Sequence, residues 1–151
     1  MENDHVTTLL SSMPDPDTVR ALEDATLGLP QVHLQTEHLV HGGMYCRSGM
    51  IPAGTLLTGA LTRHDNVCLV VGDITVTTDE GVRRLTGTHI LAAKAGAKRV
   101  GIAHADTWWV TIHATPLTDV REIEDDMTPE SAQLQTRRDG IEFVQPAQLE
   151  G

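Results

Sequence analysis

The segment VCLVVGDITVTT (67–78) decides the fold of this chain, and the segments on both sides of it repeat its pattern. Five further short apolar runs flank it: TLLTGALTR (55–63), VRRL (82–85), HILAA (89–93), RVGIA (99–103) and TWWVTIH (107–113). Turn residues with glycine separate these runs at 52–54, 79–81, 87 and 94–96. Strands of this length with such connections are typical of an antiparallel sandwich or barrel.

Composition limits the class of protein and its partners. At 151 residues the chain predicts one domain with one core. The net charge of −10 argues against a nucleic-acid partner, because neutralising phosphates needs a basic field. No apolar run reaches the roughly 20 residues of a membrane span, and the start is acidic, so we expect a cytoplasmic protein. Cys46 and Cys68 then read as reduced thiols.

The two ends differ in pattern from the barrel, which we place at 31–117. Residues 1–30 predict an arm, ordered only by a partner, followed by a short helix at 17–25. Residues 118–151 predict a helical segment and a mobile tail. Within this segment we expect a short acidic helix at 118–126 and another helix from Thr128. Residues 141–144 are expected to form a late strand or an anchor on a neighbouring subunit.

Alternation predicts which side chains enter the core. In the strand 107–113 the apolar set is expected to face the core: Trp108, Val110 and Ile112. The opposite set then faces solvent, a neighbouring subunit or a cavity: Trp109, Thr111 and His113. Residues 67–71 predict a strand buried on both sides, and Gly72 predicts a bulge or bend.

The chain has eight histidines, a residue type that often binds metal ions. His33, His38 and His41 are spaced so that no strand face holds all three, and we expect them in solvent. His89 begins an apolar strand and is expected at the surface or hydrogen-bonded in the core.

The central stretch resembles the cupin superfamily of small double-stranded β-helix (jelly-roll) barrels. Gly59, His64, Asn66 and Gly72 fall in the place of the first cupin motif, and Gly96 with Arg99 in that of the second. More narrowly, four segments look like uncharacterised cupin-like proteins of tailed bacteriophages and prophages: IPAGTLLTGAL (51–61), GDITVTTDEGVRRLTG (72–87), AGAKRVGIAHADTWWVTIHAT (95–115) and LTDVREIE (117–124). This resemblance implies a jelly-roll fold, a place in the host cytoplasm or the virion, and phage structural or host proteins as partners.

Departures from the cupin motifs bear on the cofactor. Matched by position, the chain keeps His64 but has Asn66, a valine (Val70 or Val71) and Arg99 at the other three metal-ligand positions. A single imidazole does not hold a divalent ion against water, so we expect no metal cofactor. The alternative is a divalent transition metal held by a set rebuilt from His64, His104 and His113, with Asp106.

Three functions remain open. The first is a non-enzymatic, homo-oligomeric binding or assembly module, in which Trp109 marks an interface. In the second, the barrel binds a small anion such as a nucleotide or a sugar phosphate, through Thr62, His64, Asn66, Lys98 and Arg99. Surface ion pairs with the many acids are the alternative place for Lys98 and Arg99. The third is an enzyme, either a metal-dependent dioxygenase or isomerase, or a metal-free epimerase with His64 as the base and Arg99 holding the substrate. The sequence favours binding over catalysis.

Overall fold

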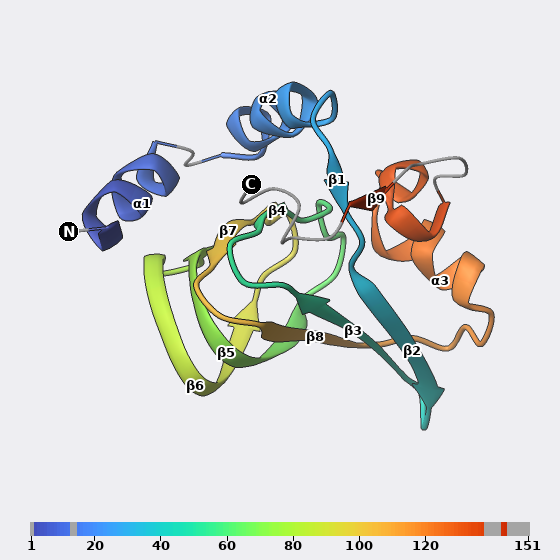
Figure 1. Ribbon diagram of the computed structural model, residues 1–151. Helices are drawn as coiled ribbons and strands as arrows, with labels where there is room; N and C mark the ends of the chain where they lie inside the picture. Colours follow the sequence, from blue (N-terminus) through green and yellow to red (C-terminus); the bar gives the residue numbers. More distant parts are fainter. Residues whose placement is uncertain (1, 13–14, 138–142, 145–151) are drawn as a thin grey trace.

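A computed structural model describes residues 2–12, 15–137 and 143–144, and it confirms the predicted all-β architecture. Seven antiparallel strands form one sheet in the order β2-β3-β8-β5-β7-β4, with β6 paired to β5. Their bounds are β2 Gln35–His41, β3 Met44–Ile51, β4 Leu56–Thr58, β5 Asn66–Thr78, β6 Gly81–Ala93, β7 Val100–Ala103 and β8 Thr107–Ala114. The sheet curls into a half-barrel with α2 above one end (Figure 1).

The β5–β6 ribbon forms one side of the half-barrel (Figure 1). Strand β6 is continuous where the sequence suggested two strands broken at Gly87, which pairs with Gly72 in the middle of the ribbon. Gly72 has φ +150°, and a Cβ there would lie 2.5 Å from Thr107 Oγ1, so only glycine lets β8 approach so closely. Gly72, where a bend was predicted, separates two pairings of β5: the strand pairs with β8 before this residue and with β7 after it.

The two faces of β8 are the reverse of those predicted. Trp109 packs against the buried core, whose members are Ile51, Val70, Ile74, Val76, Leu85 and Ala103, and His113 is buried as well. Trp108 belongs to the opposite, outer face. The expectation that 67–71 is buried on both sides is also wrong, because Val67 and Val71 are 43% and 40% exposed. Hydrophobicity misled here because 67–71 is apolar on both faces, and on β8 the less apolar face, with Thr111 and His113, turns inward to line a cavity.

The N-terminal region is helical. Helix α1 spans Glu2–Ser11, where an arm was expected, and α2 spans Pro16–Thr26, close to the predicted helix. Asp15 caps α2 by accepting a hydrogen bond from the Thr18 N–H. Leu10 of α1 is fully buried in a second cluster with Val19 and Val100, so the barrel itself orders α1.

The C-terminal region returns to the barrel. Helix α3 spans Val120–Met127 with Asp119 as its N-cap, as predicted within a residue or two. The helix expected from Thr128 is reduced to two 3-10 turns, η1 Ser131–Gln133 and η2 Gln135–Arg137. Strand β9, Phe143–Val144, pairs in parallel with β1, Gln31–Val32.

The rest of the predicted late strand and the tail at 145–151 lie outside the described residues. Within the described part of the chain, no helix is long and apolar enough to cross a membrane.

Candidate functional site

A cavity of about 540 Å³ lies inside the half-barrel. Its wall comes from the inward side chains of β3, β5 and β8, from residues 59–66, from α2 and from the segment that follows α3. A volume of this size is typical of sites for small organic ligands.

Strand register arranges the cavity wall in rows. Tyr45 lies beside His113 across the β3–β8 pairing, in a polar row at one end. The next row holds Arg47, Thr111 and Cys68, and the row after that holds Trp109 and Val70. The cavity therefore runs from a polar end to an apolar end bounded by the core.

His113 is the central residue of the polar end. It is 6% exposed, and its Nε2 is buried without a hydrogen-bond partner. Its ring meets Tyr45 edge-on and stacks on His64, with ring centroids 5.5 Å and 5.9 Å apart. Burial, and then the neighbouring His64, hold the pKa of His113 below its ordinary value, against the opposing effect of Asp126. The lowered pKa favours the neutral imidazole, in which one ring nitrogen donates and the other accepts a hydrogen bond.

The segment 59–66 brings three of the predicted ligand-binding residues to this end. His64 is half-exposed, and its Nε2 lies 2.9 Å from Oδ2 of Asp126 on α3. Asn66 donates to the His64 carbonyl and accepts from the Cys68 thiol. Thr62 has a buried Oγ1 without a partner, so it is a second unsatisfied group on the cavity wall.

Lys98 is the most deeply placed cation of the site, with a side chain 1% exposed. Its Nζ lies 3.1 Å from Glu23 of α2 and 2.9 Å from Glu130, and it also donates to the Gly59 carbonyl. Arg20 adds a second cation to Glu130. Burial alone would raise the pKa of Glu130, but the Leu61 N–H, Lys98 and Arg20 outweigh it and lower that pKa. The cluster joins α2, the 59–66 segment and the C-terminal region.

Arg99, the other cation predicted to bind the ligand, is also in an ion pair. It donates to the Thr77 carbonyl and to Asp79 at the β5–β6 turn, 3.0 Å away. The sequence placed Lys98 and Arg99 either in surface ion pairs or on an anionic ligand. The structure shows both in ion pairs, and that of Lys98 is buried.

A second ionic cluster escaped the sequence analysis. Glu124 of α3 is buried and contacts Arg47, Arg137 and Thr136. Burial pushes the pKa of Glu124 upward, but these three hydrogen bonds outweigh it, so the pKa is lowered. Arg47 also donates to the hydroxyl of Tyr45. Glu124 is one of several acidic residues in α3, and nothing in the sequence marks it as the one that is buried in an ionic cluster.

All five predicted ligand-binding residues line this one cavity: Thr62, His64, Asn66, Lys98 and Arg99. In the alternative metal set, the rings of His64 and His113 stack on each other. The third histidine, His104, is instead hydrogen-bonded to Thr75, with 2.7 Å between its Nε2 and the threonine Oγ1. Across the described residues, no group of three or more His, Cys, Asp or Glu side chains could hold a metal ion. The residues present therefore do not fit the rebuilt metal site.

The remaining histidines lie elsewhere. His33, His38 and His41 are exposed as predicted, although His38 reaches the Tyr45 hydroxyl at 2.6 Å. His89 bonds the Thr86 carbonyl, in agreement with the expectation of a satisfied histidine. A cavity was one of the three places expected for Trp109, Thr111 and His113, and all three line it. Tyr45 was missed, because its place beside His113 depends on the pairing of β3 with β8.

Neither family models nor curated protein sequences match this chain. Among solved structures, ectoine synthase from P. lautus has 16% identity and a TM-score of 0.51, over 66% of this chain and 76% of that one. KdgF from Halomonas sp. has 18% identity and a TM-score of 0.47, over 56% and 82%. A cupin superfamily protein from Desulfitobacterium hafniense has 12% identity and a TM-score of 0.47, over 58% and 82%.

At these identities the likeness concerns the fold. The likeness to ectoine synthase covers the curled antiparallel sheet, and this sheet with few short helices has the architecture of a cupin-like jelly-roll barrel. The predicted fold class is thereby confirmed.

Proposed function

We propose that this protein is a non-enzymatic binding protein that holds a small, uncharged organic molecule in the barrel cavity. The observation that carries the proposal is that two residues of the cavity wall, His113 and Thr62, each have a buried polar atom without a hydrogen-bond partner, Nε2 and Oγ1. An unsatisfied buried polar group costs about 1–3 kcal/mol, and a ligand that hydrogen-bonds to it removes that cost. The apolar part of the ligand packs on Trp109.

The charges of the site favour an uncharged ligand over a nucleotide or sugar phosphate. Lys98 and Arg47, two of the three cations that line the cavity, each contact a largely buried carboxylate. The third, Arg99, pairs with Asp79. An anionic ligand would have to compete with these carboxylates for the cations, and weakening a largely buried ion pair is costly.

Binding is also favoured over catalysis by the place of Arg99. This residue, the candidate substrate holder of a metal-free enzyme, pairs with Asp79 at the β5–β6 turn. No metal-binding set assembles among the described residues. A phage origin and a role in assembly stay predictions that rest on the sequence resemblance.

The test uses NMR with a panel of probes in two classes. The uncharged class contains 2-phenylethanol, benzamide and cyclohexanol; the anionic class contains adenosine monophosphate and glucose 6-phosphate. The two tryptophans report separately, because Trp109 lines the cavity and Trp108 lies on the outer face. We expect a member of the uncharged class, at about millimolar concentration, to shift the Trp109 indole resonance and leave that of Trp108 in place.

His113→Phe should weaken binding of that probe about two- to tenfold, the value of one hydrogen bond. His41→Phe is the matched control. His41 is exposed at the β2–β3 turn, so this variant should bind the probe as tightly as the wild type does. The proposal fails if no probe moves Trp109, or if the anionic probes bind more tightly than the uncharged ones.

A further inference from the structure

The segment between α2 and β2 forms part of the cavity wall. We call residues 27–34 the lid, and its apolar side chains line the cavity: Leu27, Leu29, Pro30, Val32 and Leu34. Leu27 and Leu29 are nonetheless 44% and 59% exposed, so they lie where the cavity meets solvent. The lid leaves the end of α2 and runs through β1, beside the C-terminal turns (Figure 1).

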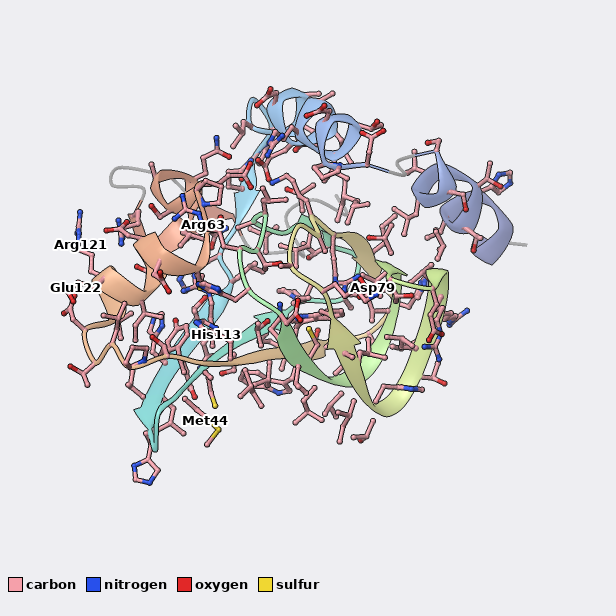
Figure 2. All side chains as sticks on the ribbon, turned by 180° about the vertical axis from the view of Figure 1, so that it is seen from behind. Met44, Arg63, Asp79, His113, Arg121 and Glu122 are labelled. Atoms are coloured by element: carbon pink, nitrogen blue, oxygen red, sulfur yellow. The ribbon has the colours of Figure 1, made fainter. Side chains whose placement is uncertain are left out.

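The opposite walls of the cavity are held by the sheet and by α3. His113 and Cys68 belong to β8 and β5, which pair with each other, and Figure 2 shows His113 at the β8 wall with α3 beside it. The Arg63 N–H donates to the Met127 carbonyl, and the Arg63 guanidinium donates to the Asp125 carbonyl. These bonds tie the end of α3 to the barrel, so this side of the cavity is fixed.

The lid is joined to the C-terminal region by neutral hydrogen bonds. The side-chain amide of Gln135 donates to the Val32 carbonyl at 2.9 Å and accepts from the Leu34 N–H at 3.0 Å. The two-residue pairing of β1 with β9 adds to this contact. Among the described residues, neither of the two buried apolar clusters includes a member of the lid. Segments with few buried apolar contacts open at a low free energy.

The two ends of the lid are held more firmly. Before it, Glu23 of α2 pairs with Lys98, which also pairs with Glu130, and the Lys98 side chain is 1% exposed. After it, β2 pairs with β3 along its whole length. Breaking a largely buried ion pair or a strand pairing costs more than releasing the two hydrogen bonds of Gln135. The Gln135 contact is therefore the part of this wall that opens most easily.

We propose that residues 27–34 open to admit the ligand, and that Gln135 is the latch that closes them. The inference rests on the proposed function, since it assigns control of entry to the same cavity. A ligand beneath the closed lid covers the exposed parts of Leu27 and Leu29. The apolar surface removed from water then favours the closed, ligand-bound state.

The thiol of Cys68 reports the opening without any ligand. Cys68 lines the cavity and is 3% exposed, and Cys46→Ser removes the other cysteine to give the parent protein. Labelling by N-ethylmaleimide then measures how readily a small uncharged molecule reaches the cavity. Gln135→Ala should speed this labelling about five- to thirtyfold, which corresponds to the loss of one or two hydrogen bonds.

Gln35→Ala is the matched control. Gln35 is the residue after the lid, is exposed on β2 and does not line the cavity, so this variant should be labelled at the rate of the parent. Equal rates in Gln135→Ala and the parent would overturn the proposal. So would a parent labelled as fast as the unfolded chain, because the cavity would then stand open.

Urea separates lid opening from global unfolding. Opening the lid exposes little surface, so the labelling rate of the parent should change little with urea below the unfolding transition. A rate that rises from zero urea with the slope of global unfolding would mean that Cys68 is reached only by unfolding, which contradicts the lid. Because no ligand is used, the two proposals fail separately: a silent Trp109 contradicts binding, and unchanged Cys68 labelling contradicts the latch.

Discussion

The burial of His113 defines the site at the scale of single residues. A histidine within the mostly apolar run TWWVTIH is placed by alternation alone, and alternation leaves two faces to choose from. The structure turns His113 inward with Trp109, beside Tyr45 and His64. A neutral imidazole with a free nitrogen is the consequence.

This burial predicts a dependence of stability on pH. The pKa of His113 is lowered in the folded chain, so on acidification the unfolded chain takes up its proton first. The free energy of unfolding therefore falls as the pH drops below about 6.5, the ordinary pKa of histidine. His113→Gln should make this fall shallower, as measured by urea unfolding between about pH 7.5 and pH 5.5.

A residual slope should remain in that variant, because burial, and then Arg47, also lower the pKa of His38. His41→Gln serves as the control, and its slope should equal that of the wild type, since His41 is exposed. Equal slopes for His113→Gln and wild type would contradict the inferred burial of a neutral His113.

Single elements show where local sequence signals suffice. The limits of α2 and α3 follow from Asp15, Pro16 and Asp119, which are local capping signals. Helix α1 is different. Its sequence has little apolar surface, and its order comes from Leu10, which fits between α2 and β7.

We predict that Leu10→Ala lowers the free energy of unfolding by about 2–3 kcal/mol, because it leaves a cavity in the cluster with Val19 and Val100. Leu9→Ala, one position away and 43% exposed, should change stability by less than about 0.5 kcal/mol. Chemical denaturation of both variants makes the comparison. Equal effects would mean that α1 does not dock through Leu10.

At the scale of the whole molecule, the net charge of −10 acts against the compact state, because like charges lie closer together in the folded chain than in the unfolded chain. Salt screens this repulsion. We predict that raising sodium chloride from about 20 mM to about 500 mM raises the midpoint of urea unfolding. A lower midpoint at high salt would mean that screening costs the ion pairs of Lys98 and Glu124 more than it relieves self-repulsion.

The sequence by itself determined the all-β class, the hairpin at Asp79, the bend at Gly72 and the capped helices α2 and α3, because each rests on turn chemistry, alternation or capping within a few residues. It also identified five residues that line one cavity. Only the tertiary structure decided which face of β8 is inside, because the less apolar face lines a cavity that β8 forms with β3 and β5. The ionic partners of Lys98 and Glu124 were likewise beyond sequence reasoning, since Glu23 and Arg47 lie 75 and 77 positions away from them.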